Sequence, residues 1–319
     1  MINNCRLLTN TVLPKRRSLL QTKLEYYVAR SLVGAFSLLP LQTSIKIGAA
    51  LGRRAQKFGG KLNRVGRKNL QLALPDLNES EQTEILRGCF ESLGRQFGLL
   101  AHFKSLKPEI ARDLLEMEGR ENFDRAVATG RGVLMFTGHF GSWEVFNLVP
   151  KAFADAQMNV LVRRLDNPLI ENLVESLRTA FGGKTIDKKT SARAMFRLLQ
   201  NGELLGVMAD LNVQEREGVF VDFFGVPAST SASLAKLALR TEAIVMPAFA
   251  IWQPERQKYL LKLETPIEYE KTGDDARDVI ELTQKVTKIV EKYVRAFPEQ
   301  WMWIHKRWNT RPPGEAKIY

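Results

Sequence analysis

Cysteine is scarce in this chain of 319 residues, which contains only Cys5 and Cys89. Two cysteines cannot build a disulfide framework, and neither belongs to a Cys-x-x-Cys pair. Three common glycine motifs are also missing: GxGxxG, the P-loop and GxSxG. These absences argue against a disulfide-stabilised secreted domain, a dinucleotide-binding enzyme, a nucleotide triphosphatase and an α/β-hydrolase. They favour a body that remains in the cytoplasm.

Long apolar runs are missing as well. The stretch from Ser31 to Leu41 is apolar but only eleven residues long, whereas a spanning helix needs about 20. Arg30, Pro40 and Lys46 interrupt any longer window. We expect an interfacial helix or short anchor here, and whether residues 24–50 span or lie on a bilayer stays open. Residues 1–23 lack the apolar core and cleavage site of a signal peptide.

Acidic residues are nearly absent from the N-terminal segment. Residues 1–70 contain 14 Lys and Arg and one acid, Glu25, while the remainder contains 33 basic and 34 acidic residues. The net charge of +12 therefore comes from the first 70 residues. A nearly neutral remainder argues against a nucleic-acid groove, and a basic, partly apolar segment favours a membrane surface with anionic lipid. A core helix with a solvated basic face is the alternative.

From about residue 116 the chain alternates between strand and helix patterns, which predicts an α/β fold with a layered sheet flanked by helices. The division expected is a membrane-associating segment at 1–70, a helical lead-in at 71–115 and the α/β domain at 116–319. Expected strands are 132–137, 158–163, 204–208, 219–223, 243–252 with a break at Pro247, and 259–263. Expected helices are 121–129, 143–154, 168–180 capped by Asn167, 191–200 capped by Ser191, 229–240, and 275–297 with Ile280 among its apolar positions.

The most informative motif is Thr137-Gly-His-Phe-Gly-Ser-Trp-Glu144, directly after the apolar strand at 132–137. A neutral imidazole can remove a proton from a hydroxyl near pH 7, and a carboxylate can orient it and stabilise its charged form. The carboxyl end of a strand is where α/β folds usually place such groups. We expect His139 and Glu144 to form a catalytic dyad, and a structural histidine is the alternative.

The motif Gly138-His-Phe-Gly-Ser-Trp-Glu144 resembles the H-x4-D/E signature of the late lipid A acyltransferases, the lauroyl and myristoyl transferases within the glycerolipid acyltransferase superfamily. Further blocks follow in the order of that family. They are Val162-Arg-Arg-Leu-Asp-Asn-Pro168, Asp210 with Gly218-Val-Phe-Val-Asp-Phe-Phe-Gly225, and Pro298-Glu-Gln-Trp-Met-Trp-Ile-His-Lys-Arg-Trp308. Arg67-Lys-Asn-Leu-Gln-Leu-Ala73 extends the likeness upstream. Leu211 departs from the pattern, which leaves the acceptor contacts open.

The resemblance implies a glycerolipid-acyltransferase-like fold and acyl transfer from acyl carrier protein, or acyl-CoA, to a hydroxyl of a lipid A precursor. It implies no metal and no cofactor, and it implies a location on the cytoplasmic face of the cell inner membrane. Substrate-binding candidates are Arg163 or the adjacent Arg164, together with Asp210, which could orient the acceptor or Arg163. Lys184 could touch phosphate, although a solvated lysine in a turn is the simpler interpretation.

Two other functions remain open at this point. A lysophospholipid acyltransferase would use the same dyad with a different acceptor, and a thioesterase would use water. A membrane-surface scaffold, in which the dyad is structural, is the non-enzyme alternative. The aromatic cluster Trp301, Trp303 and Trp308 could form an interfacial belt with Lys306 and Arg307, or Trp303 could pack in the core. The oligomeric state stays open.

Overall fold

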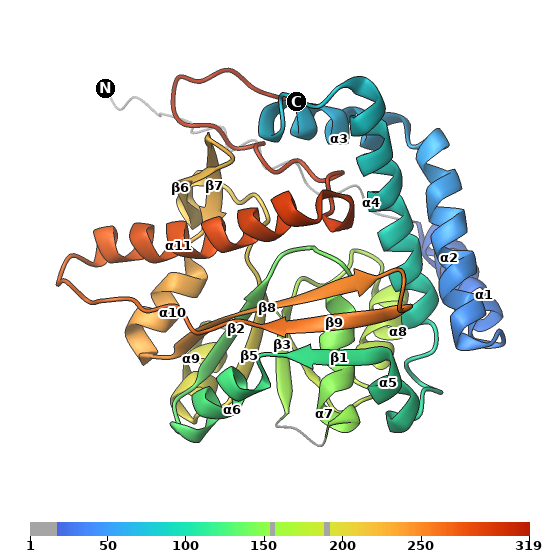
Figure 1. Ribbon diagram of the computed structural model, residues 1–319, viewed down its shortest axis with the longest axis horizontal. Helices are drawn as coiled ribbons and strands as arrows, with labels where there is room; N and C mark the ends of the chain where they lie inside the picture. Colours follow the sequence, from blue (N-terminus) through green and yellow to red (C-terminus); the bar gives the residue numbers. More distant parts are fainter. Residues whose placement is uncertain (1–17, 154–156, 188–191) are drawn as a thin grey trace, which may run out of the picture.

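The computed structural model describes residues 18–153, 157–187 and 192–319. Within these residues, a seven-stranded sheet lies at the centre of the molecule (Figure 1). Its strands run in the order β1-β9-β8-β2-β5-β3-β4. Their bounds are β1 Leu115–Glu118, β2 Val133–Thr137, β3 Met158–Val162, β4 Lys184–Asp187, β5 Leu204–Met208, β8 Ile244–Gln253 and β9 Lys258–Leu263.

Most neighbouring strands of this sheet are parallel, and only β8 and β9 pair antiparallel. Every residue of β2 is buried, as the apolar sequence of a strand covered on both faces predicts. The expected α/β class is therefore confirmed. The expected break at Pro247 is wrong, because β8 is one continuous strand. It pairs with β2 up to Pro247 and with β9 from Ala248 onward. Strands β1 and β4 were not expected.

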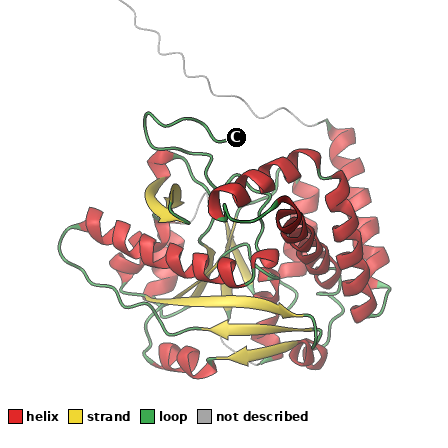
Figure 2. Ribbon diagram, turned by 45° about the horizontal axis from the view of Figure 1, so that its top comes forward, coloured by secondary structure: helices red, strands yellow, loops and turns green. Residues whose placement is uncertain are grey.

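Helices cover both faces of the sheet, as Figure 2 shows. One face packs against α9 (Ala192–Gln200), α10 (Ser233–Thr241) and α11 (Asp275–Ala296). The other packs against α6 (Arg120–Ala128), η2 (Trp143–Leu148), α7 (Val149–Ala152) and α8 (Pro168–Arg178). Two separate apolar clusters result, one on each face.

Two expected helices differ from the structure. The segment expected to begin a helix at Ser229 instead forms β7 (Val226–Ser231), which pairs antiparallel with β6 (Gly218–Phe223), and the helix α10 begins at Ser233. The segment after Trp143 is a 3-10 helix of six residues and then the short α7, rather than one α-helix. The expected end at residue 154 and the expected Ser191 cap lie outside the described residues.

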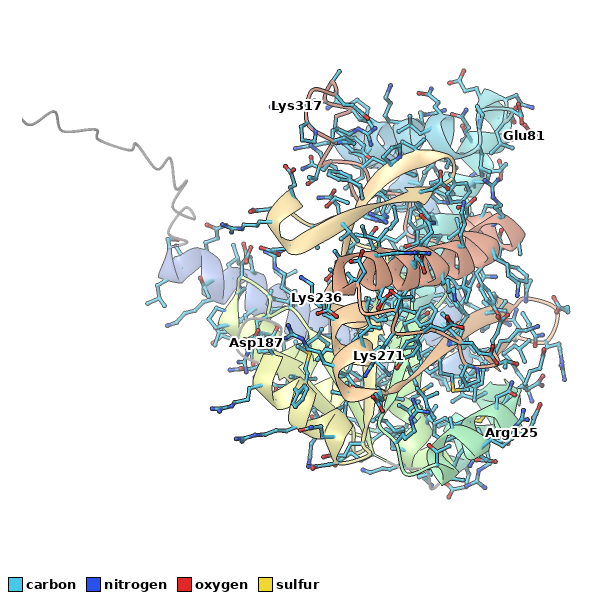
Figure 3. All side chains as sticks on the ribbon, turned by 90° about the vertical axis from the view of Figure 1, so that its left-hand side faces the viewer. Glu81, Arg125, Asp187, Lys236, Lys271 and Lys317 are labelled. Atoms are coloured by element: carbon cyan, nitrogen blue, oxygen red, sulfur yellow. The ribbon has the colours of Figure 1, made fainter. Side chains whose placement is uncertain are left out.

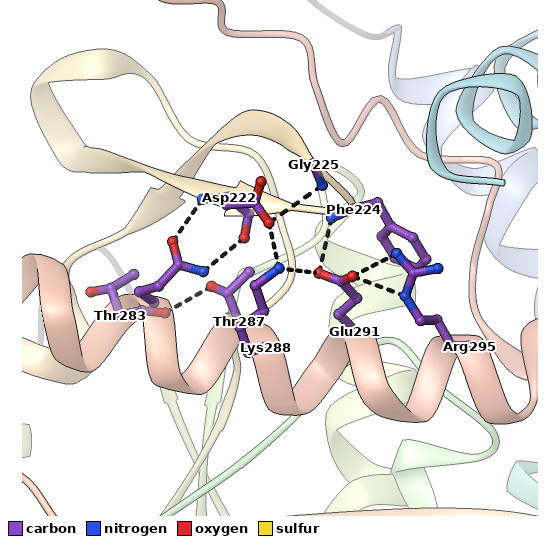
Figure 4. A network of polar contacts seen from close by, with 9 residues as sticks. Asp222, Phe224, Gly225, Thr283, Thr287, Lys288, Glu291 and Arg295 are labelled. Carbon is purple, nitrogen blue, oxygen red and sulfur yellow. Dashed lines mark hydrogen bonds and ion pairs between the residues drawn. The ribbon is translucent and has the colours of Figure 1, made fainter. Parts of the chain in front are cut away.

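A polar network fastens the β6–β7 hairpin to α11 (Figure 4). Gln284 accepts a hydrogen bond from the Asp222 amide at 2.7 Å and donates one to its carbonyl oxygen at 2.9 Å. Glu291 accepts one from the Phe224 amide at 2.9 Å and pairs with Arg295 at 2.7 Å. Of the positions expected to be apolar and buried on this helix, Ile280 is instead exposed.

The N-terminal part of the described chain is helical, as expected, and forms one side of the molecule in Figure 1. Its helices are α1 (Leu19–Ser37), α2 (Leu41–Ala55), α3 (Gly60–Ala73), α4 (Glu79–Leu100) and α5 (Pro108–Leu114), with the 3-10 turn η1 (Gln56–Phe58). No helix in the described ranges is both long enough and apolar enough to cross a membrane.

Helices α2 and α4 approach each other through glycine. A Cβ atom at Gly48 would overlap the carbonyl oxygen of Gly94, and one at Gly94 would overlap the carbonyl oxygen of Gly48. Ser44 donates a hydrogen bond to the Gly98 carbonyl oxygen at 2.8 Å in the same contact. This close backbone approach fixes α2 against the rest of the protein and leaves its opposite side free.

The free sides of the first helices carry large apolar side chains that are exposed to solvent. On α1 they recur every four residues, which places them on one helical stripe. The stripe comprises Leu20, Leu24, Val28 and Leu32, and Ile47, Leu51 and Phe58 continue the exposed apolar surface on α2 and η1. We call these seven residues the N-terminal apolar face.

Candidate active site

Three candidate residues follow the carboxyl ends of three adjacent parallel strands. His139 lies two residues after β2, Asp210 lies two residues after β5, and Arg163 directly follows β3. The pairing of Thr137 with Met208 places the ends of β2 and β5 at the same level. Parallel strands gather the loops that follow them at one edge, so the topology itself brings these side chains together.

His139 is held by Asp210 at two points. Its Nδ1 lies 2.7 Å from Asp210 Oδ1, and its backbone amide donates to Asp210 Oδ2 at 2.6 Å. An ionised carboxylate only accepts hydrogen bonds, so Nδ1 must carry the proton. The lone pair is then on Nε2, and His139 itself lines a cavity. This tautomer is the one a general base needs.

Asp210 is fully buried, yet it is surrounded by donors. Burial alone would raise its pKa, but the imidazole of His139 and its hydrogen bonds outweigh that effect and hold the pKa below its usual value. Trp301 donates a further hydrogen bond through Nε1 to Oδ2 at 2.8 Å. The carboxylate is therefore ionised at neutral pH, and it can stabilise an imidazolium when His139 takes up a proton.

Glu144 does not occupy the place expected for it. Its carboxylate accepts hydrogen bonds from Arg178 Nε at 3.0 Å, from Arg178 Nη2 at 2.5 Å and from Asn147 at 3.0 Å. The expectation that Glu144 orients His139 is thus corrected, because Asp210 holds that imidazole. Glu144 is the second residue of the 3-10 helix η2 and lies on the wall of the same cavity. Its part in catalysis remains a prediction.

Arg178 is a site residue that the sequence analysis missed. Burial disfavours its charge, but the hydrogen bonds that Arg178 donates to Glu144 and the negative charge of Glu144 outweigh this and raise its pKa. Arg178 is the last residue of α8. A basic residue in the last turn is common in any helix, so the sequence carries no signal that would separate this arginine from a solvated one.

The turn that contains His139 is supported by the C-terminal block. Gly141 has a φ of 56°, and a Cβ there would overlap the Ala250 carbonyl oxygen. Its amide donates to the Gln300 carbonyl oxygen at 2.8 Å, and the Met302 amide donates to the His139 carbonyl oxygen at 2.9 Å. Glycine is required here because another residue would be strained and would clash.

The sequence block Arg67–Ala73 lies on α3 and reaches the same region. Asn69 is fully buried and donates hydrogen bonds to the carbonyl oxygens of Trp303, at 2.6 Å, and His305, at 2.7 Å. His305 lies beside the pair of His139 and Asp210, and the centre of its ring is 6.4 Å from that of the His139 ring. Burial lowers the pKa of His305 to about 4, so its ring is neutral near pH 7.

The tryptophans of the C-terminal block belong to the core. Trp301, Trp303 and Trp308 have no exposed surface, and Arg307 is buried with them. The guanidinium of Arg307 lies 5.0 Å from the centre of the Phe223 ring. The expected interfacial belt is therefore wrong, because the β6–β7 hairpin packs on these rings. The alternative of core packing for Trp303 is confirmed.

A cavity of about 630 Å³ lies at the edge of the sheet beside His139. Thr137, His139, Trp143, Glu144 and Arg163 contribute to its wall. Apolar side chains from the sheet and the covering helices form most of the remainder. Its size is typical of a small-molecule site, and such sites combine a mostly apolar wall with a few placed polar groups.

Of the two adjacent arginines, Arg163 lines the cavity with an exposed side chain, whereas Arg164 pairs with Asp187 through Nε at 3.1 Å. This placement favours Arg163, and its role stays a prediction. Asp187, which is labelled in Figure 3, is the last residue of β4. Lys184 is exposed at the start of the same strand and is not part of the cavity wall.

The segment after Arg163 also holds α1. Asn167 caps α8, as expected, by accepting hydrogen bonds from the amides of Leu169 and Ile170. Its side-chain nitrogen donates to the Thr22 carbonyl oxygen and to Glu25, both at 3.0 Å. Helix α1, which carries part of the N-terminal apolar face, is therefore attached to the segment that follows Arg163.

Comparison with known proteins gives one consistent result. The model of the family "Bacterial lipid A biosynthesis acyltransferase" matches residues 14–310. The lipid A biosynthesis lauroyltransferase of Escherichia coli (strain K12) is 30% identical over 286 residues, which cover 88% of this chain and 90% of that protein.

Two further relatives from the same organism match over a similar length. The lipid A biosynthesis palmitoleoyltransferase is 24% identical over 88% of this chain and 90% of that protein. The lipid A biosynthesis myristoyltransferase is 23% identical over 90% of this chain and 87% of that protein. The match spans the histidine turn, the arginine segment and most of the C-terminal block, and the chain belongs to the bacterial lipid A biosynthesis acyltransferase family.

Proposed function

We propose that this acyltransferase moves a fatty acyl group from acyl carrier protein, or less favourably from acyl-CoA, to a hydroxyl on an acyl chain of a lipid A precursor. The family supports the reaction class and the acceptor. The observation that carries the proposal for the chemistry is the hydrogen bond between His139 and the buried Asp210 beside an apolar cavity.

His139 acts as the general base in this proposal. Its Nε2 takes the proton of the acceptor hydroxyl while Asp210 stabilises the imidazolium. The oxygen attacks the thioester carbonyl, the tetrahedral intermediate collapses, and the carrier leaves as a thiolate that receives the proton from His139. One ester bond forms and one thioester bond breaks. This sequence needs neither a covalent acyl-enzyme nor a metal or cofactor.

The cavity wall offers cations for the negative charge that develops on the carbonyl oxygen. We assign this role to Arg163, because the amides of His139 and Gly141 in the adjacent turn already donate to Asp210 and to the Gln300 carbonyl oxygen. We assign Glu144 to the cavity wall as the group that positions Arg178. Preorganised donors of this kind act strongly because the surrounding wall is apolar and excludes water.

We further propose that the N-terminal apolar face rests on a membrane surface that contains anionic lipid, at the cytoplasmic face of the inner membrane. Two observations support this: apolar side chains are exposed along α1 and α2, and the segment carries a large basic excess. The attachment of α1 to Asn167 would place a lipid acceptor near the cavity without taking it fully out of the membrane.

An acyl-transfer assay on the detergent-purified protein tests the reaction. Labelled lauroyl-, myristoyl- and palmitoyl-carrier protein are offered with a tetra-acylated lipid A precursor and, in parallel, with lysophospholipid. His139→Ala and Asp210→Asn are compared with the unaltered protein, and loss of the base or its partner should lower the rate about 10²–10⁴-fold. Lys184→Ala is the matched control, because Lys184 lies outside the cavity wall.

Transfer to the glycolipid that both site substitutions abolish supports the proposal. Transfer to lysophospholipid alone would keep the base and replace the acceptor. Release of free fatty acid without transfer would indicate a thioesterase. Absence of any reaction from a folded, membrane-bound protein would refute the enzymatic proposal and favour a scaffold.

A further inference from the structure

The cavity beside His139 reaches both faces of the sheet. Successive side chains on a strand point to opposite faces, yet consecutive residues of three strands line this cavity. They are Met135 and Phe136 on β2, Val160 and Leu161 on β3, and Gly206 and Val207 on β5. A cavity confined to one face would contact alternate side chains only.

The first of the two parts lies between the sheet and the segment around η2 and α8, and we call it the α8 lobe. Strand register aligns Met135, Gly206 and Val160 across the sheet. Gly206 leaves this row open, because a Cβ there would meet Met158 Sδ only at 3.5 Å. Phe146 and the polar group of Glu144, Asn147 and Arg178 complete the wall.

The second part lies between the opposite face and helices α9, α10 and α11, and we call it the α10 lobe. Phe136, Val207 and Leu161 form its sheet side, and all three belong to the apolar cluster of that face. The helices contribute Met195, Leu234, Leu237 and Val286. The polar lining residues on this side are the exposed Arg193 and the hydroxyl residues Thr230, Ser231, Ser233 and Thr283, whereas the α8 lobe carries the ion pair of Glu144 and Arg178.

The two lobes meet at the carboxyl edge of the sheet, where His139 and Thr137 line the cavity. This shape fits the product of the proposed reaction. When the acceptor hydroxyl is itself on an acyl chain, transfer creates an ester from which two hydrocarbon chains diverge. One reacting point between two apolar spaces on opposite sides of a sheet can hold both chains at once.

We infer that the α10 lobe holds the acyl chain of the donor and the α8 lobe holds the chain of the hydroxyacyl acceptor. Val207 bounds the α10 lobe, and Gly206 leaves room in the α8 lobe. This inference rests on the proposed function. The assignment follows from polarity, since a saturated donor chain has no group to match the Glu144, Asn147 and Arg178 wall. An acceptor chain carries its own carbonyl group close to the reacting hydroxyl.

Two neighbouring residues on β5 give a matched test. Val207→Phe narrows the α10 lobe, and Gly206→Ile narrows the α8 lobe with a β-branched residue that suits a strand. With Val207→Phe, the transfer rate for palmitoyl relative to lauroyl donor should fall at least about 10-fold, because a pocket discriminates about that strongly per methylene. With Gly206→Ile the donor ratio should stay constant, and acceptors with a long hydroxyacyl chain should react more slowly than short ones. Thermal unfolding confirms that each variant is folded.

A second measurement does not depend on turnover. Palmitate with a terminal diazirine is photolysed with the His139→Ala protein, and the labelled peptides are mapped. Two sets are expected, one containing Met158 or Phe146 and one containing Met195 or Leu237. Val207→Phe should remove the second set, and Gly206→Ile should remove the first.

The outcomes separate this inference from the proposed function. Absence of transfer by the unaltered protein refutes the proposed function, while the labelling still decides whether two lobes bind chains. Labelling of one set only, or loss of both sets through either substitution, overturns the two-lobe inference. If Val207→Phe changes the preference for acceptor chain length and Gly206→Ile changes the preference for donor chain length, the assignment of donor and acceptor is overturned. If Val207→Phe fails to fold, Leu237→Ala replaces it and should favour longer donors.

Discussion

Asp210 is the residue on which the donors of the site converge. It receives hydrogen bonds from the amide and ring of His139 and from Trp301, which come from opposite ends of the catalytic domain. Asp210 and His139 are 71 positions apart. The sequence identified both as candidates, but it could not pair them, because the order of strands in a sheet is a property of the fold. Short sequence spacing therefore favoured Glu144.

The role of Glu144 can be tested through stability. Glu144→Ala leaves the mostly buried guanidinium of Arg178 without its partner, and we expect a loss of about 3 kcal/mol in the free energy of unfolding. Arg178→Met added to this variant should restore much of the loss, because no unpaired charge remains. Urea unfolding of the two single variants and the double variant measures the coupling. Equal stability of Glu144→Ala and the unaltered protein would contradict the ion-pair role.

The lowered pKa of His305 predicts that the stability of the protein depends on pH. Its pKa falls from the ordinary 6.5 to about 4 in the folded state, chiefly through burial. Below pH 6.5 the unfolded chain therefore binds a proton that the folded protein refuses, so this residue lowers stability as the pH falls toward 4. The difference corresponds to about 3 kcal/mol.

His305→Asn, which keeps a donor for the Met302 carbonyl oxygen, should remove that part of the acid sensitivity. The measurement is urea unfolding of both proteins at pH 7 and pH 4.5. Asp210 contributes in the same sense but in a lower pH window, since its lowered pKa gives stability that is lost only as the pH falls below its ordinary value of 3.8. A stability difference between the two proteins that does not change with pH would refute the prediction for His305.

At the scale of elements, the sequence predicted best where a segment is buried on both sides or strongly amphipathic. The strands at β2 and β5 and the long helix α11 lie where they were expected. It failed at Ser229-Thr-Ser231, which has the composition of a helix cap but pairs with β6 instead. It also failed at the tryptophans, because a ring that packs on a distant hairpin has the same local sequence as one at a membrane surface.

The glycine contact between α2 and α4 gives a prediction at this scale. Gly48→Ala and Gly94→Ala each place a methyl group against backbone of the other helix, and overpacking of this kind costs about 1–3 kcal/mol. Gly34→Ala on α1 is the control, because a Cβ there meets nothing within 4 Å. That control should be neutral or slightly stabilising. Thermal unfolding compares the three, and a Gly48→Ala protein as stable as the control would show that the helices can separate freely.

At the scale of the whole molecule, the N-terminal helices combine a basic excess with exposed apolar side chains. No described helix spans a membrane, yet apolar side chains remain exposed on the same helices that carry the basic excess. The division into segments at residues 70 and 115 stays a prediction. Helix α4 lies within the expected segment 71–115 and contacts both α2 in the first segment and η4 (Pro298–Gln300) in the C-terminal block.

Membrane association can be tested by substitutions in the N-terminal apolar face. Leu20→Glu with Leu24→Glu should reduce co-sedimentation with vesicles that contain anionic lipid, since each substitution places a charge on the N-terminal apolar face. Ile280→Glu is the matched control, because Ile280 is similarly apolar and 44% exposed on α11. Added salt should weaken the binding of the unaltered protein. Equal losses from both variants would contradict a binding surface on α1.

The bonds from the C-terminal block to the histidine turn also have a consequence for protein synthesis. Residues 300–302 supply part of the support for Gly141, His139 and Asp210, so the full set of contacts around His139 forms only after these residues have been synthesised. The strands and the cavity can form earlier during translation. If the proposed function holds, a ribosome-bound chain would carry the cavity before the fully supported His139, and it would use acyl donors efficiently only after the final segment emerges.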